Sequence, residues 1–282
     1  MKKLSISLAW SEAVAFVRRE AALLVPLGFM LLALPSVLMS LAMPVPATPG
    51  AMAAQAIPEP GLWMLLYPVV LVGTIVGSVA VAALALTPGL SVGEAIRRGL
   101  QRLLPMLGAF LLLGLVCVCF VFLLMAIVAV MMPGAAQGFA TQDFQAAAGA
   151  IVLIMLIIVP LAVYLLARFI LMTPIAAAED QGPIALLKRS WALTAGHVLR
   201  LIGFVLLFII AVAILGAVIQ ILAGIAVAAT LGPVEPRTAS FIVMTLLAAV
   251  VNTVASVYFT STVARAYVQL AAARVAPVPK TA

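Results

Sequence analysis

Of the 282 residues, 67% are hydrophobic and 8% are charged, and the formal net charge is +7. Soluble domains contain roughly 45–50% apolar and about 25% charged residues, so this composition excludes a soluble fold and predicts an integral membrane protein. At about 20 residues per span, the length accommodates six spans and leaves no room for a separate soluble domain of ordinary size.

Six apolar runs follow one another along the chain and predict the transmembrane helices. Each is long enough to cross the roughly 30 Å of hydrocarbon in a bilayer. We therefore expect an all-α fold, a polytopic bundle that forms a single membrane domain over residues 1–272, with a short cytoplasmic tail at residues 273–282. The predicted spans cover residues 21–43, 62–87, 104–132, 147–172, 201–230 and 239–264.

Basic residues are concentrated on one side of these spans. All but one of the 15 Lys and Arg residues lie on the side that holds both termini, and the exception is Arg237. The positive-inside rule makes the basic side cytoplasmic, so we expect a multi-pass protein of the bacterial cytoplasmic (inner) membrane with both termini in the cytoplasm. The excess positive charge is thus an orientation signal, and no nucleic-acid partner is expected.

Two Thr-Pro motifs indicate an internal repeat. Leu86-Thr87-Pro88 closes the second predicted span and Met172-Thr173-Pro174 closes the fourth. A cationic segment with apolar residues at helical spacing follows each motif, and another precedes the first span. These segments predict three cytoplasmic amphipathic helices that lie in the membrane interface. The bundle is therefore expected to contain three pseudo-repeats, each an interfacial helix followed by two spans.

Three such helices would form a basic collar on the cytoplasmic side. The collar either only sets topology and anchors the bundle, or it binds lipid headgroups or a partner protein. Each cation near an anionic leaflet contributes about 1 kcal/mol of attraction. The candidate binding residues are Arg97, Arg98, Arg168, Glu179, Asp180, Lys188, Arg189, Trp191 and Arg200.

The stretch from Glu179 to His197 is more specific than the rest of the chain. It resembles the loop between the fourth and fifth spans in the glycerophosphoryl diester phosphodiesterase membrane-domain family and in related bacterial six-span proteins. An acidic pair, a Gly, an Ala-Leu, a Lys-Arg-Ser-Trp and a Leu-Thr-x-Gly recur there in this order. The matching residues are Glu179, Asp180, Gly182, Ala185, Leu186, Lys188, Arg189, Ser190, Trp191, Leu193, Thr194 and Gly196.

The resemblance implies a membrane module without its enzyme. Some family members carry a phosphodiesterase barrel after the membrane region, whereas this chain stops at Ala282. The chain has one histidine, and no cluster of acidic residues could hold a divalent metal. We therefore expect neither catalysis nor a cofactor or metal.

Within the specific stretch, Gly182-Pro183 is expected to end one helix and begin the next, because proline is tolerated in the first turn. Glu179 and Asp180 would then lie near the positive end of that helix. The nearby cations Lys188, Arg189 and Arg200 could pair with these carboxylates or with lipid phosphates, and Arg168 is expected within reach of the same loop. The segment is thus either a structural salt-bridge network or an anion-binding site.

A polar stripe is predicted inside the last span. Asn252, Ser256 and Thr260 are spaced i, i+4 and i+8 and share one helical face. Such groups either hydrogen-bond between helices or line a polar path or substrate cleft. Gly73 and Gly77 form a small-xxx-small face in the second span, and Pro26, Pro35 and Pro160 predict kinks.

Two functions follow from these patterns. The first is a non-enzymatic membrane module that binds anionic lipid headgroups or scaffolds envelope proteins through its basic cytoplasmic face. The alternative is a small-solute or lipid transporter with a cleft between the helical repeats. The expected partners are membrane lipids, above all anionic phospholipids, and other membrane proteins.

Overall fold

A computed structural model describes residues 5–43, 61–141, 143–236 and 238–275. Every regular element in these ranges is helical, and six segments are long and apolar enough to cross a membrane. The chain is therefore an all-α, multi-pass membrane protein, as its composition predicts. The expected orientation rests partly on Lys2, Lys3, Arg237 and Lys280, which lie outside the described residues, as does most of the proline-rich connection at residues 44–61.

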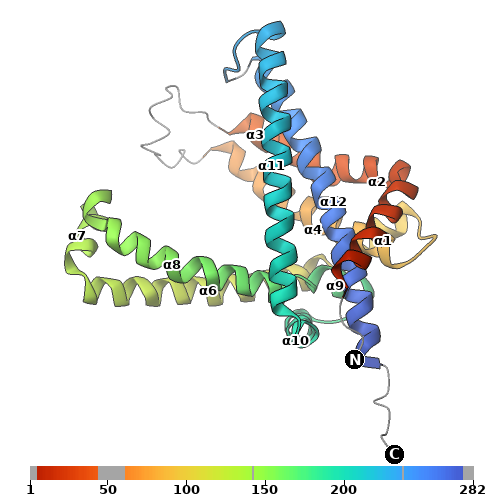
Figure 1. Cartoon of the computed structure of the whole chain (residues 1–282), viewed down its shortest axis with the longest axis horizontal. Helices are drawn as coiled ribbons and strands as arrows, with labels where there is room; N and C mark the ends of the chain where they lie inside the picture. The colour runs from red at the N-terminus through yellow and green to blue at the C-terminus, as the bar shows by residue number, and fades with distance from the viewer. Residues whose placement is uncertain (1–4, 44–60, 142, 237, 276–282) are drawn as a thin grey trace, which may run out of the picture.

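The six spans form three hairpins that point in different directions (Figure 1). In the first hairpin, α2 (Ala21–Gly28), η1 (Phe29–Ala33) and α3 (Leu34–Ala42) make one span, and η3 (Leu62–Leu65) and α4 (Leu66–Leu86) make the other. The second hairpin consists of α6 (Leu103–Met131), a short α7 (Pro133–Thr141) and α8 (Phe144–Phe169). The third consists of α11 (Val198–Leu231) and α12 (Ala239–Val275).

An amphipathic helix precedes each hairpin, which confirms the predicted repeating order. These helices are α1 (Ile6–Arg19), α5 (Val92–Gln101) and α10 (Pro183–Thr194). Ser91 and Glu94 form a reciprocal capping box at the start of α5. The three repeats differ in their packing, because α5 lies against α4 of the preceding hairpin, whereas α1 lies along α12, the last helix of the chain.

The two Thr-Pro motifs differ in structure. Thr87 caps the end of α4, as predicted. The second motif does not close a helix, which corrects the prediction: α8 ends at Phe169, and α9 (Met172–Ala178) begins at Met172. Pro174 lies in the first turn of α9, where its missing N–H would have had no helical partner.

Proline also shapes the first span. Between Pro26 and Pro35 the helix widens into the π-turn η1, in which the N–H of Leu34 donates to the carbonyl oxygen of Phe29. Single π-turns inside α-helices are rare and are frequent at functional sites. Pro160 lies inside α8, which continues through it.

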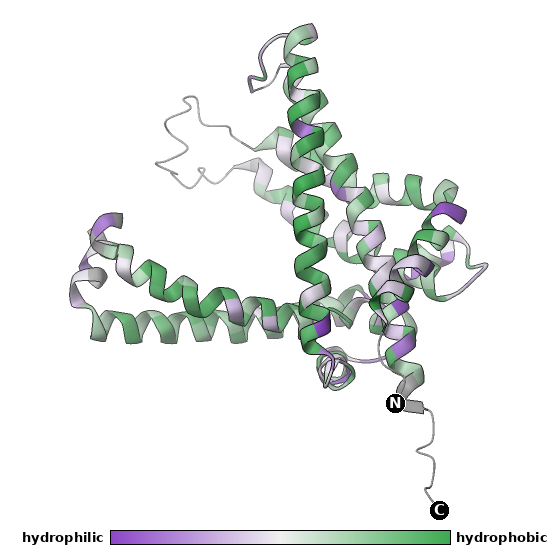
Figure 2. Ribbon diagram, in the orientation of Figure 1, coloured by the Kyte–Doolittle hydropathy of each residue, from purple (hydrophilic) through white to green (hydrophobic). Residues whose placement is uncertain are grey.

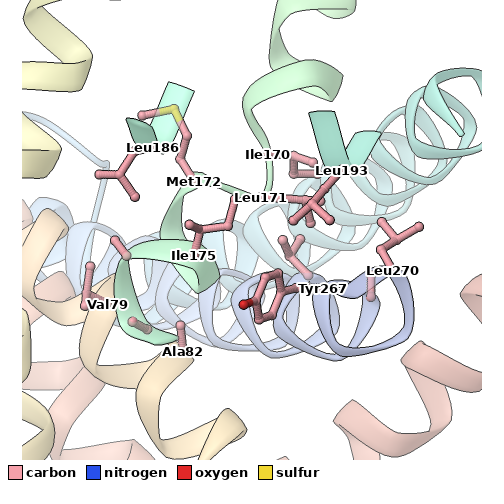
Figure 3. Close-up of a cluster of buried hydrophobic side chains, with 14 of the residues drawn as sticks. Val79, Ala82, Ile170, Leu171, Met172, Ile175, Leu186, Leu193, Tyr267 and Leu270 are labelled. Atoms are coloured by element: carbon pink, nitrogen blue, oxygen red, sulfur yellow. The ribbon is translucent and has the colours of Figure 1, made fainter. Parts of the chain in front are cut away.

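Side chains from α4, α9 and α12 form the centre of the molecule. Figure 3 shows Leu171 and Ile175 between Val79 of α4 and Tyr267 of α12, with Met172 beside Leu186, and all of these residues are buried. The second span is the most enclosed: 61% of its apolar 18-residue stretch is buried, against 11% of the corresponding stretches of the third, fifth and sixth spans. In Figure 2 the more exposed helices α6, α8 and α11 are hydrophobic along most of their length, as lipid-facing helices must be.

The predicted small-residue face of the second span packs on the first span. A Cβ atom at Gly73 would lie 2.6 Å from the carbonyl oxygen of Leu31, and one at Gly77 would lie 3.0 Å from the side chain of Leu32. Only glycine permits so close an approach.

The last helix extends past residue 264, the predicted end of its span. It continues to Val275, so residues 273–275 of the predicted tail are helical, and residues 276–282 lie outside the described residues. The turns of α12 beyond residue 264 pack against α1. There the backbone N–H of Ser5 donates a hydrogen bond to Oε1 of Gln269 at 3.1 Å.

Candidate functional site

Glu179 is the centre of a polar cluster at the basic end of the molecule, the end that carries the amphipathic helices. Its Oε1 accepts hydrogen bonds from the hydroxyl of Tyr267 at 2.8 Å and from Nε of Arg189 at 3.2 Å. Its Oε2 accepts one from Nε2 of Gln181 at 2.5 Å. One carboxylate therefore ties together α12, α10 and the loop between α9 and α10.

Asp180 pairs with a different cation. Its carboxylate accepts a hydrogen bond from Arg102, which follows α5, and this contact holds the pKa of Asp180 below its usual range. Arg98, on the last turn of α5, donates to the carbonyl oxygen of Ala177 at 3.4 Å. The α9–α10 loop is thus held by α5 and by the start of α6.

Arg168 is held by aromatic rings. Its Nε donates to the hydroxyl of Tyr164 at 2.9 Å, and its guanidinium lies 4.3 Å from the ring centre of Trp191. Its carbonyl oxygen accepts a hydrogen bond from Ser190 at 2.7 Å. Arg168 was expected within reach of the Glu179–Asp180 loop. The two carboxylates instead form their ion pairs with Arg189 and Arg102.

The predicted site residues therefore fall into two groups. Six of them, which include Trp191 as the ring partner of Arg168, form structural contacts inside the protein. Three cations, Arg97, Lys188 and Arg200, are exposed and make no hydrogen bond or ion pair within the described part of the chain. The residues in structural contacts are Arg98, Arg168, Glu179, Asp180, Arg189 and Trp191.

Four further residues at the basic end escape prediction from sequence. Arg102 and Gln181 bind the acidic pair, and Tyr267 lies beyond the predicted end of the last span. The fourth is Arg265, which is half-buried. Its Nε is buried and has no hydrogen-bond partner among the described residues. Its guanidinium lies 5.8 Å from the ring centre of Phe16. No local pattern distinguishes these residues, because their roles depend on contacts between distant segments.

The polar stripe of the last span faces a cavity. Asn252 and Ser256 line a cavity of about 510 Å³ between η1–α3, α4 and α12. Neither side chain, nor that of Thr260, makes a hydrogen bond within the described ranges. The contacts therefore fit a polar cleft better than a hydrogen bond between helices.

Residues 4–270 match a family model described as a domain of unknown function, DUF7847. The chain belongs to this family. No curated protein and no solved structure matches it. The resemblance of residues 179–197 to the glycerophosphoryl diester phosphodiesterase membrane domain stays a prediction.

The carboxylates and the cations of the basic end differ in what they leave available to a ligand. Among the described residues, no three His, Cys, Asp or Glu side chains gather in a group able to hold a metal ion. Glu179 and Asp180, the carboxylates nearest to the specific sequence stretch, are engaged by protein donors. What these contacts leave available to a ligand is positive charge.

Proposed function

We propose that the chain is a non-enzymatic module of the bacterial cytoplasmic membrane that binds anionic phospholipid headgroups through its basic face, with both termini in the cytoplasm. The observation that carries the proposal is an excess of unpaired cations. Five basic side chains at this end have no hydrogen-bond or ion-pair partner within the described residues. They are Arg18, Arg97, Lys188, Arg200 and Arg265.

Within the described residues, no carboxylate at this end forms an ion pair with these five cations, and the exposed Glu12 on α1 is itself unpaired. Glu20 pairs with Arg19, and Glu94 caps α5 through Ser91. Glu179 and Asp180 are engaged as described above. A lipid phosphate is the anion that a membrane supplies in quantity at this depth, and anionic leaflets attract clusters of Lys and Arg.

The unpaired cations are carried by elements that hold one another in place. Arg97 is on α5, whose end is joined to the start of α10 by the Arg102–Asp180 pair. Lys188 is on α10, and Arg200 lies in the first turn of α11, directly after it. The structural contacts hold α5, α10 and the start of α11 in place. The backbone that carries these cations therefore needs little rearrangement when an anion binds, and this lowers the entropic cost of binding.

Half-buried Arg265 gives the proposal its most specific element. Removing a charge from water without a partner costs several kcal/mol, so buried charges are normally paired. Arg265 has an aromatic neighbour but no acceptor in the described part of the chain. A phosphate oxygen would satisfy it.

The test uses purified protein in non-ionic detergent, titrated with fluorescent phosphatidylglycerol and, separately, with fluorescent phosphatidylcholine. Replacing Arg97, Lys188 and Arg200 together by Gln should weaken phosphatidylglycerol binding by about five-fold for each cation removed, since each contributes about 1 kcal/mol. Phosphatidylcholine binding should not change. Unchanged phosphatidylglycerol affinity in the triple variant would contradict the proposal.

The matched control keeps the charge and changes the side chain. Arg97→Lys, Lys188→Arg and Arg200→Lys together should retain most of the affinity, because lipid attraction depends on charge. If this control loses as much affinity as the Gln variant, the residues recognise a shaped protein partner instead, and the scaffold alternative is favoured.

A further inference from the structure

The cavity beside Asn252 lies away from the basic end. It is bounded by Leu32, Ser36 and Ser40 of the first span, by Thr74 of α4, and by α12 from Phe241 to Ser256. Ser40 is near the end of α3, and Phe241 is near the start of α12, so the cavity begins at the membrane surface opposite the basic end. At about 1.5 Å per helical residue it reaches roughly 22 Å along α12, which is past the middle of a hydrocarbon layer about 30 Å thick.

The described lining of this cavity combines polar and apolar side chains. It contains hydroxyl groups and the Asn252 amide beside apolar residues such as Leu32 and Phe241, and no Asp, Glu, Lys or Arg among the described residues. Ser36 and Ser40 donate to carbonyl oxygens of their own helix at 2.8 and 2.9 Å, which leaves their oxygens free to accept. An unsatisfied amide in hydrocarbon costs several kcal/mol, so Asn252 needs a hydrogen-bonding partner that the described helices do not provide.

A second, apolar groove adjoins the first. It has a volume of about 130 Å³ and is lined by residues that include Leu24, Phe29, Val254 and Tyr258. Thr253 lines both cavities, and the π-turn η1 contributes Leu32 to the polar one and Phe29 to the apolar one. The apolar groove extends toward the basic end, to Val17 and Tyr258.

The order of polarity along the two grooves is that of a lipid. The lining residues of the two grooves overlap in depth on α12 between Val250 and Ser256. From there the hydrogen-bonding groove extends to the surface opposite the basic end, and the apolar groove extends toward the basic end. We infer that the two grooves bind one uncharged amphiphile of the diacylglycerol type, with its hydroxyl and ester groups near Ser36 and Asn252 and an acyl chain along Phe29 and Val254. A charged headgroup is disfavoured, because none of the described residues that line the site is charged.

This inference does not rest on headgroup binding at the basic end, since neither groove is lined by any of the unpaired cations named above. Its test places the full chain in phosphatidylcholine nanodiscs with a diacylglycerol that carries a photoactivatable diazirine in one acyl chain. After irradiation, adducts are mapped by peptide mass spectrometry. Labelling should concentrate on residues 24–33 and 250–258, and unlabelled dioctanoylglycerol should compete with it.

Asn252→Leu should reduce the competable labelling roughly two- to ten-fold, which corresponds to one lost hydrogen bond. Gln220→Leu is the matched control, because it removes an amide from α11, outside both grooves, and it should leave labelling unchanged. Ala248→Leu narrows the polar cavity without removing a polar group, and it should reduce labelling too, so that a folding defect in one variant does not decide the result.

Three outcomes would overturn the inference. Adducts spread evenly over α6 and α11, without competition, would indicate only the lipid annulus. Equal, competable labelling by a photoactivatable phosphatidylglycerol would show that charge is not excluded. Competition by glycerol or sorbitol as strong as that by dioctanoylglycerol would show that the polar cavity takes a solute and that the apolar groove is not part of the site.

Discussion

Tyr267 donates a hydrogen bond of 2.8 Å to Glu179, a residue 88 positions earlier in the chain. The same oxygen also accepts from Arg189 on α10. The last helix is thereby joined to the loop that carries the most specific sequence of the chain. Glu179, which looks like a ligand-binding carboxylate in the sequence, is a structural one.

Removing the Tyr267 hydroxyl should loosen this junction. Tyr267→Phe is expected to lower the free energy of unfolding by about 1–2 kcal/mol, since a hydrogen bond to a partly solvated charge is lost. Thermal unfolding in detergent, followed by intrinsic fluorescence, measures the change. Tyr258→Phe is the matched control, because its ring packs on Trp10 and its hydroxyl has no hydrogen bond in the described residues. Equal effects of the two variants would contradict this role.

The contact between the first two spans should not tolerate a methyl group. Gly73→Ala places a Cβ atom 2.6 Å from the backbone oxygen of Leu31, and such overpacking typically costs about 1–3 kcal/mol. Gly114→Ala, in α6, meets nothing within 4 Å and should be neutral or slightly stabilising. The melting temperatures of both variants test this prediction. A Gly73→Ala protein that melts at the same temperature as Gly114→Ala would contradict the close contact between Gly73 and Leu31.

Arg168 should not be replaceable by lysine. Its planar guanidinium stacks on Trp191 while Nε bonds Tyr164, and an ammonium group cannot do both. Arg168→Lys is expected to cost about 0.5–1 kcal/mol of stability, the usual size of an exposed cation–π contact. Arg200→Lys changes an exposed arginine without a partner and should leave the melting temperature as it is. If Arg168→Lys leaves the melting temperature unchanged, only the positive charge of Arg168 contributes to stability, and the role of its planar group is contradicted.

The Arg102–Asp180 pair should make stability depend on acidity. Arg102 lowers the pKa of Asp180 in the folded protein. The pair therefore contributes its full stabilisation to the folded state above the pKa of Asp in the unfolded chain, about 3.9. This contribution is lost as the pH falls through the lower pKa of the folded state. The melting temperatures of the native protein and Asp180→Asn should therefore differ at neutral pH and converge in acid. Arg102→Gln should behave like Asp180→Asn, and a difference that persists in strong acid would rule the pair out as its cause.

Hydropathy located the spans because each is a long apolar run, and amphipathic spacing located the helix before each hairpin. It could not place Met172-Thr173-Pro174, because a Thr-Pro sequence fits both the end of a helix and its first turn. The excess length of α12 was hidden for a related reason: Ala264 to Val275 alternates small, basic and aromatic residues, which suit a helix outside lipid as well as one inside.

The candidate site was predictable as a region but not as a set of contacts. Charge alone identified the loop at Glu179 and Asp180, yet it paired these residues with cations nearby in sequence. The pair between Arg189 and Glu179 forms as this predicts, but the other partners, Arg102 and Tyr267, are 78 or more positions away. Asn252 and Ser256 were correctly seen to share a face, but the cavity before them depends on how the first span packs.

The contact between α1 and α12 sets the order in which the molecule can be completed. Ser5 meets Gln269 across 264 positions, so the first helix is made long before its partner exists. At about 5–20 residues per second, α1 waits roughly 10 to 50 s for the last helix to be synthesised. During that time Phe16 of α1 can already pack on the first hairpin, whereas the face of α1 that contacts α12 has no protein partner until the last helix is made.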